Sequence, residues 1–205
     1  METELRQGLE KMQIEASDEQ QTKLIAFINL LEKWNKAYNL TAVRKKQDML
    51  PLHILDSLSL VPYLQDSQHI LDVGSGAGLP GIPLAVLEPQ RQFVLLDSNG
   101  KKTRFIRQAI IELKLENVSV EHTRLENYTP TEKFDCITTR AFATIAETID
   151  MLEHFLTSDA KILFMKSNTA EEETQNLAED YKKEIFTLSV PGITAPRTVA
   201  VVSKH

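Results

Sequence analysis

Two different spacings of hydrophobic residues divide the chain. Up to about residue 66, apolar side chains recur every three or four residues, the period of helices with one buried face; the longest such stripe comprises Leu24, Phe27, Ile28, Leu31, Trp34 and Tyr38. Ser17 and Gln20 precede this stripe with the spacing of a capping box at a helix start. We predict a helical N-terminal extension over residues 1–66 and a second unit over residues 67–205, and we expect Trp34 and Tyr38 to be core residues.

From residue 68 onward, short apolar blocks alternate with helical stripes. The blocks predict strands at residues 70–73, 92–97, 117–121, 134–138, 160–166, 183–190 and 197–203, and the stripes predict helices at residues 81–88, 101–114, 144–156 and 170–180. Alternating strands and helices form a parallel sheet covered by helices, which is an α/β fold. A turn with Pro191, Gly192 and Pro196 joins the last two strands, so we expect an antiparallel edge on this sheet.

A dense run of glycines lies between the first strand and the helix that follows it. Four of the seven glycines fall within eight residues, namely Gly74, Gly76, Gly78 and Gly81. Glycine permits positive φ angles and lets the backbone approach a ligand closely. The N-terminus of the next helix directs free N–H groups into the turn. This arrangement predicts a cofactor-binding turn.

The spacing of these glycines distinguishes two kinds of cofactor. The dinucleotide fingerprint G-x-G-x-x-G requires glycine at position 79, where this chain has Leu79. The observed G-x-G-x-G resembles motif I of the S-adenosylmethionine-dependent methyltransferases. The next strand ends in Asp97, about 20 residues further on, where a carboxylate accepts hydrogen bonds from ribose hydroxyls. A nicotinamide-dependent oxidoreductase and a tight turn without a ligand are the alternatives.

Composition and charge narrow the class of protein. The 205 residues fit one ordinary domain with a small addition, and the net charge of −6 argues against a broad, non-specific nucleic-acid binder. The polar N-terminus and short apolar runs predict a cytoplasmic protein without membrane association. The lone Cys136 suits a reducing compartment and is expected to be buried in a strand. We predict no metal, because no paired Cys/His spacing is present.

Charged residues follow several predicted strands on the side where α/β sheets bind ligands. Ligands bind outside the carboxyl ends of the strands, where the strand order reverses. Asp97 and Lys166 end two of the predicted strands, and Glu126 and Arg140 lie a few residues after two others. Arg140, directly after an apolar strand, is the strongest candidate for function; the alternative is a structural ion pair with Glu126 or Asp72.

Several longer motifs together resemble one family, the bacterial 16S rRNA guanine-N7 methyltransferases, also called the glucose-inhibited division protein B family. The matching segments are WNKAYNLTAV at 34–43, HILDSLSL at 53–60, DVGSGAGLPGIPLA at 72–85, LLDSNGKKTRFI at 95–106, LENVSVEHTRLENY at 115–128, FDCITTRA at 134–141 and APRTVAVVSK at 195–204. One departure is Ser167, at a position where the family usually has glycine.

The resemblance implies a Rossmann-like methyltransferase fold with a mostly parallel seven-stranded sheet. It implies methylation at N7 of a guanine in a 16S rRNA loop of the small ribosomal subunit, with S-adenosylmethionine as the cofactor and S-adenosylhomocysteine as the product. Carried over from the family, the cofactor contacts are Gly74, Leu79, Leu125, Glu126 and Arg140, to which the glycine and strand-end patterns add Gly76, Gly78 and Asp97. Arg140 and Lys166 are the catalytic candidates.

Local basic clusters are the candidate RNA contacts of this acidic chain. They comprise Arg44, Lys45, Lys101, Lys102, Arg104 and Arg197. Acidic proteins bind RNA only through such local patches. We expect a monomer, because no heptad or large apolar stripe is left over. Two further alternatives are a small-molecule methyltransferase, which would usually carry a lid, and a non-enzymatic ribosome assembly factor.

Overall fold

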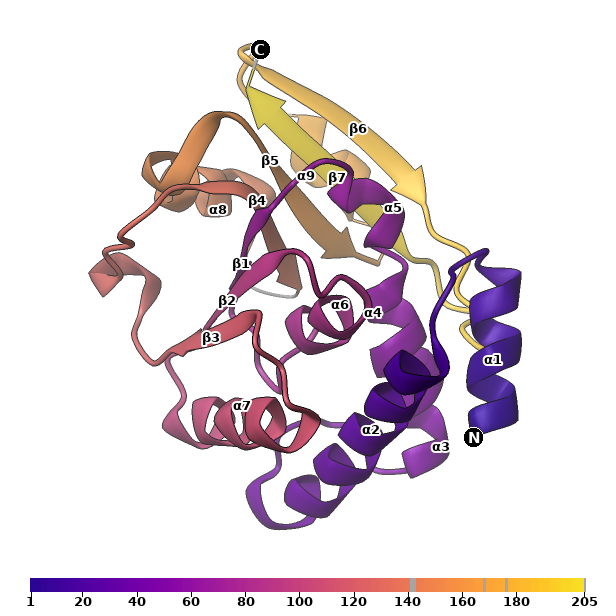
Figure 1. Ribbon diagram of the computed structural model, residues 1–205. Coiled ribbons are helices and arrows are strands. Elements are labelled where there is room, and N and C mark those ends of the chain that lie inside the picture. The colour runs from indigo at the N-terminus through magenta and orange to yellow at the C-terminus, as the bar shows by residue number, and fades with distance from the viewer. Residues whose placement is uncertain (141–142, 168, 176, 205) are drawn as a thin grey trace.

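The computed structural model describes residues 1–140, 143–167, 169–175 and 177–204, and within these a seven-stranded sheet organises the second part of the chain. Figure 1 shows the sheet running through the middle of the molecule, with helices packed around it. The strands are β1 (His69–Val73), β2 (Gln92–Leu96), β3 (Val118–Glu121), β4 (Phe134–Arg140), β5 (Leu156–Lys166), β6 (Tyr181–Thr187) and β7 (Thr198–Lys204). This confirms the predicted α/β fold.

The strand order is β3-β2-β1-β4-β5-β7-β6, and β7 pairs antiparallel with both of its neighbours. The predicted antiparallel edge is therefore confirmed, with β7 inserted between β5 and β6. The order reverses between β1 and β4, whose register places Val73 beside Thr139. Gly74, which follows β1, and Arg140, the last residue of β4, therefore lie at the switch point.

Element boundaries differ from the sequence-based expectation at a few places. β5 begins at Leu156, four residues before the predicted strand, and the short 3-10 helix Glu153–Phe155 separates it from α8 (Ile145–Leu152). β6 begins at Tyr181 and ends at Thr187. β6 is the edge strand, and polar positions such as Lys182 lack the apolar signal that marks a buried strand, which is why its start was missed. Ala141, which ends a predicted motif, and Asn176, inside a predicted helix, lie outside the described residues.

Helices cover both faces of the sheet and form the N-terminal extension. They are α1 (Glu2–Lys11), α2 (Asp18–Tyr38), α3 (Lys46–Met49), α4 (Asp56–Leu58), α5 (Val61–Leu64), α6 (Gly81–Leu87), α7 (Gly100–Leu113), α8 and α9 (Ala170–Gln175), with a π-helical segment at Leu50–Leu55 and a 3-10 turn at Leu125–Asn127. No helix in the described ranges is long and apolar enough to cross a membrane.

The predicted capping box forms at the start of α2 and also docks the extension on the sheet domain. The Ser17 hydroxyl accepts a hydrogen bond from the Gln20 amide at 3.2 Å, and the Gln20 side chain accepts one from the Ser17 amide at 2.8 Å. The Gln20 side-chain amide also donates to the Leu87 carbonyl at 3.0 Å. This contact joins the start of α2 to the end of α6.

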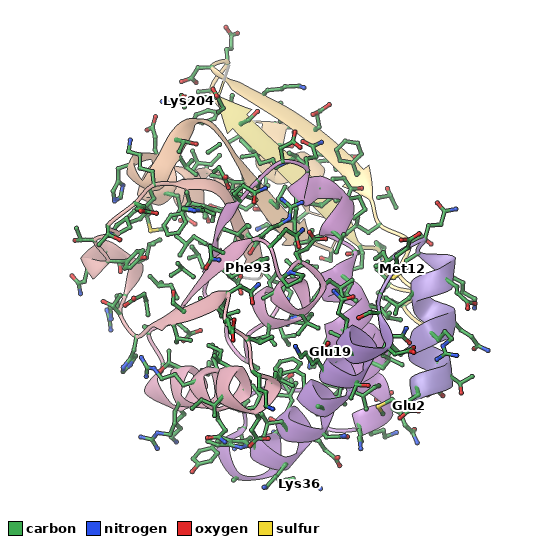
Figure 2. The ribbon with its side chains drawn as sticks, viewed as in Figure 1. Glu2, Met12, Glu19, Lys36, Phe93 and Lys204 are labelled. Carbon is green, nitrogen blue, oxygen red and sulfur yellow. The ribbon has the colours of Figure 1, made fainter. Side chains whose placement is uncertain are left out.

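The core is continuous across the extension and the sheet. Phe27 of α2 is fully buried, with its ring centroid 5.9 Å from that of Phe105 in α7. Trp34 packs against the same ring at 5.8 Å, as expected of a core residue. Figure 2 shows Phe93 in the interior, whereas Lys36 lies at the exposed end of α2.

The expectation that Tyr38 is a core residue was wrong, because its side chain is 37% exposed at the C-terminal end of α2. Its ring packs on Trp34, but it is the last residue of the helix and lacks further covering turns. Cys136 is completely buried in β4, as predicted, and burial raises the pKa of its thiol to about 12. A thiol in this state is an inert packing group.

Replacing Phe27 with alanine tests whether the extension and the sheet domain unfold together. Phe27→Ala should lower the free energy of unfolding by about 3–5 kcal/mol, because it opens a cavity between α2 and α7. Urea or thermal unfolding should show a single transition that moves as a whole. The control Tyr38→Ala changes an exposed aromatic residue of the same helix and should cost far less. Two separate transitions, with only one moved by Phe27→Ala, would contradict a shared core.

Candidate cofactor and substrate site

The glycine turn after β1 adopts the backbone that the sequence pattern predicts. Gly74, Gly76 and Gly78 have φ angles of 69°, 59° and 77°, which L side chains rarely adopt. The amides of Gly74 and Ser75 donate to the Leu96 carbonyl at 2.9 and 3.1 Å. The turn is thus held against the carboxyl end of β2.

A buried carboxylate fixes this turn to the sheet. Asp72 is completely buried in β1, and one of its oxygens accepts the Gly81 amide at 3.0 Å. The other accepts the Thr138 hydroxyl of β4 at 3.1 Å. Burial raises the pKa of Asp72 to about 6, and these hydrogen bonds and the Arg140 charge oppose the rise. Sequence analysis considered Asp72 only as an ion-pair partner; a charged residue inside an apolar strand was the available signal.

Gly81 is required for close approach rather than for a special φ angle. A Cβ atom at this position would lie 2.8 Å from the Asp72 carboxylate and 2.8 Å from Cγ of Leu95. Both distances are shorter than real Cβ contacts allow. The start of α6 can therefore approach β1 only when residue 81 lacks a side chain.

Asp97 lies at the end of β2, where its carboxylate organises two loops. One oxygen accepts the Gly76 amide at 2.8 Å, and the other accepts the Asn99 amide at 2.8 Å. Asp97 is 7% exposed, so its carboxylate still reaches the surface of the site. A carboxylate has about four acceptor positions, which leaves capacity for hydroxyl groups of a ligand.

A cavity of about 470 Å³ lies beside the turn. It is lined by four predicted cofactor residues, Gly74, Asp97, Leu125 and Glu126, and by Leu96, Ser98, Asn99, Lys102, Thr123 and Arg124. Gly76 and Gly78 shape the turn, whereas Leu79 is buried in the core at 2% exposure. Lys102, predicted to contact RNA, lines this cavity, and its ammonium lies 3.9 Å from where a Gly76 Cβ would be.

The cavity and the nearby backbone fit a nucleoside-containing cofactor. The glycine turn leaves space that a side chain at residue 76 would enter, and the Asp97 carboxylate borders the same cavity. In addition, the Thr139 hydroxyl is buried without a hydrogen-bond partner among the described residues. Thr139 is next to Val73 in the sheet, close to the start of the turn.

A second cavity of about 540 Å³ lies at the carboxyl ends of β4 and β5. The sheet domain contributes Arg140, Met165, Lys166, Ser167, Thr169 and Arg197, and the N-terminal extension contributes Val43, Leu52, His53 and Asp56. The structure therefore brings together the predicted catalytic residues, Arg140 and Lys166. The sequence patterns did not indicate that the N-terminal extension lines this cavity.

Asp56 is the acidic partner of Arg140, in place of the Glu126 or Asp72 considered from the sequence. Nη1 of Arg140 lies 3.4 Å from one Asp56 oxygen, and Nε of Arg197 donates to the other at 3.0 Å. Arg197, predicted to contact RNA, thus directs part of its guanidinium inward.

Lys166 is fixed by partners on the far side of the second cavity. Its ammonium donates to Glu173 of α9 at 2.7 Å and to the Ala143 carbonyl at 2.9 Å. Glu173 also accepts the Ile145 amide at 2.9 Å, at the start of α8. The end of β5 is thereby joined to α8 and α9.

His53 is a neutral, buried member of the same cavity. Burial, and then the nearby Arg140 charge, lower its pKa to about 4. Its Nδ1 lies 2.9 Å from the Leu52 carbonyl, which fixes the proton on that nitrogen, and Nε2 accepts the Thr41 hydroxyl at 2.9 Å. Both nitrogens are satisfied within the extension.

The remaining predicted RNA contacts lie on the surface. Arg44, Lys45, Lys101 and Arg104 are exposed. Arg44 donates to the Asn39 side chain at 2.9 Å, near the end of α2. No group of three or more His, Cys, Asp or Glu residues that could hold a metal ion occurs in the described ranges.

The fold is that of the Rossmann-like methyltransferases. Solved structures share the fold at low sequence identity. Ribosomal protein L11 methylase from Lactobacillus delbrueckii subsp. bulgaricus gives a TM-score of 0.60 with 19% identity, covering 78% of this chain and 80% of that one. The plantazolicin methyltransferase BpumL, solved in complex with SAH, gives 0.55 with 13% identity over 90% and 97% of the two chains.

Sequence comparison identifies the family. The model of the GidB family, described as rRNA small subunit methyltransferase G, matches residues 20–200. Ribosomal RNA small subunit methyltransferase G of Ectopseudomonas mendocina is 46% identical, covering 98% of this chain and 95% of the relative. The protein of the same name from Idiomarina loihiensis is 44% identical over the full length of both. The chain belongs to the rRNA small subunit methyltransferase G family, which confirms the resemblance seen in its motifs.

The buried His53 should make stability depend on pH. Because its pKa in the folded protein lies below the ordinary value of 6.5, the unfolded chain binds the proton more readily. His53 therefore contributes stability that is complete above pH 6.5 and is lost as the pH falls toward 4, by up to about 3 kcal/mol. Urea unfolding measured from pH 7 to pH 4 gives the free energy of unfolding at each pH. This free energy should fall less between pH 7 and pH 4 for His53→Gln than for wild type. The control, His154→Gln, removes an exposed histidine; an equal change in both variants would contradict the assignment.

Proposed function

We propose that the protein transfers the methyl group of S-adenosylmethionine to N7 of a guanine in 16S rRNA of the small ribosomal subunit. The observation that carries this is the pair of cavities at the carboxyl ends of neighbouring strands β1 and β4. One contains a strand-end carboxylate beside a glycine turn, and the other contains cations and apolar side chains. Membership of the family supports the rRNA substrate, and the motif resemblance supports N7 as the acceptor.

The first cavity is proposed to hold the cofactor. Asp97 would accept hydrogen bonds from the ribose hydroxyls, and Leu125 and Glu126 would border the adenosine. The glycine turn leaves backbone space for the methionine part, and Arg140 would pair with its carboxylate or with the guanine O6. The bound cofactor supplies an electrophilic methyl group on a sulfonium; the residues of this chain bind and orient the reactants.

The chemistry at N7 requires alignment rather than a base. Guanine N7 carries an in-plane lone pair and no proton, so no group has to remove one. The neutral His53, with both nitrogens satisfied, is consistent with this. Arginine commonly donates to both O6 and N7 of guanine, but a donor on N7 would occupy the reacting lone pair. We therefore assign Arg140 to O6 or to the methionine carboxylate, and Lys166 to the acceptor nucleoside.

Surface cations near the site are the proposed RNA contacts. Arg44 and Lys45 lie in the loop after α2, and Lys101 and Arg104 lie on the first turns of α7. α2 packs on α7, and Trp34 near the end of α2 contacts Phe105 in the first half of α7. Phosphate contacts of this kind give affinity without sequence specificity. A cytoplasmic monomer that acts on the small subunit is the proposed form of the protein.

Methyl transfer from labelled S-adenosylmethionine tests the proposed function. Small subunits that lack the modification, naked 16S rRNA and tRNA are offered in parallel, and the labelled RNA is digested to nucleosides. We expect 7-methylguanosine in the subunit or in 16S rRNA. Label on another nucleoside would refute N7 as the acceptor. Cofactor binding without any transfer to these RNAs would refute the substrate, and failure to bind the cofactor would favour the assembly-factor alternative.

The α7 cations should contribute to the salt dependence of RNA binding. Lys101→Ala with Arg104→Ala should weaken binding to 16S rRNA and lower the slope of log affinity against log salt by about 2, because about two phosphate contacts are lost. The matched control is Lys11→Ala with Lys182→Ala, two exposed lysines on α1 and β6. An unchanged slope in the first double variant would remove α7 from the RNA-binding surface.

A further inference from the structure

We propose that Asp56 is a positioning residue for methyl transfer, which makes the N-terminal extension part of the substrate pocket. This inference rests on the proposed function and concerns the same site. Asp56 lies 84 residues before Arg140 and 141 residues before Arg197, and the fold brings all three together. Its carboxylate orients both guanidinium groups and offsets their charge.

The geometry places the Asp56 carboxylate as a bridge between the two arginines. One oxygen lies 3.4 Å from Nη1 of Arg140, and the other accepts from Nε of Arg197 at 3.0 Å. Asp56 itself is only 3% exposed, so solvent screens these contacts weakly. Ion pairs in such surroundings hold their partners in defined orientations more firmly than surface pairs do.

The extension restrains Arg140 through a second acceptor as well. The Leu52 carbonyl lies 3.4 Å from the same Nη1 atom of Arg140. A guanidinium has five N–H donors in a fixed plane. Holding Nη1 on the extension leaves the other donors, in a fixed orientation, for a ligand in the cavity.

The charge of Asp56 also matters for the reaction. Methylation at N7 places positive charge on the purine, next to a cavity lined by Arg140, Arg197 and Lys166. Glu173 pairs with Lys166, and Asp56 pairs with the two arginines. Without Asp56, two partly buried arginines would lack their acidic partner beside the purine, onto which positive charge shifts from the sulfonium, and this repulsion would slow the reaction.

A double-mutant cycle tests whether Asp56 acts through Arg140. Asp56→Asn, which keeps the shape and removes the charge, should lower kcat for transfer to 16S rRNA at least tenfold. In an Arg140→Gln background it should have little further effect, because the partner that it positions is gone. Asp56→Glu should restore part of the rate. The control Asp66→Asn changes an exposed aspartate of the same extension, and thermal unfolding of each variant shows whether it is folded.

Equal effects of Asp56→Asn with and without Arg140 would overturn the proposal, because they would indicate a purely structural role. A second readout does not need activity. In the 15N–1H spectrum of the wild-type protein, the Arg197 Nε–H signal should be protected from solvent exchange, and Asp56→Asn should abolish that protection. If wild type does not methylate 16S rRNA, the proposed function fails, and this spectrum alone decides whether Asp56 holds the arginines. An unprotected Arg197 signal in wild type would overturn the positioning role.

Discussion

The buried carboxylate of Asp72 is the interaction on which the site depends. It joins three elements at the switch point of the sheet: β1 itself, the start of α6 through the Gly81 amide, and β4 through the Thr138 hydroxyl. Its burial is unfavourable, as the raised pKa shows, and the hydrogen bonds offset that cost. Because the start of α6 can approach β1 only when residue 81 lacks a side chain, the carboxylate and the glycine together set the path of the turn. Asp97 then fixes the same turn from the neighbouring strand.

The second constraint is that the extension and the sheet domain share both a core and a cavity. Phe27 packs on Phe105, and the Gln20 side chain binds the end of α6, so the extension is held in one place. That placement puts Asp56 and His53 opposite Arg140. A reacting base must be held within a narrow range of geometry. The extension provides one side of the cavity and the sheet domain provides the cations, so the two segments together can position a substrate base.

The sequence predicted the features that depend on local patterns. The strands, the capping box at Ser17 and the acid at Asp97 follow from spacing and from neighbours along the chain. It did not predict the partner of Arg140, because that partner lies 84 residues away and no periodicity links the two. The same holds for the insertion of β7 between β5 and β6, which local alternation leaves open. Tyr38 continued the helical stripe but lies where α2 ends, and a stripe does not report where its cover stops.

A crystal structure of the protein with S-adenosylhomocysteine tests the central claim most directly, namely that the switch point between β1 and β4 is the site of methyl transfer. We expect the ribose hydroxyls on the Asp97 carboxylate and the methionine part beside Gly74, between the two cavities. The cavity of about 660 Å³ near Asp66, Asp159 and Lys161 lies away from the glycine turn. Density for the ligand there, with nothing beside Gly74 and Asp97, would rule out the switch point as the site of methyl transfer.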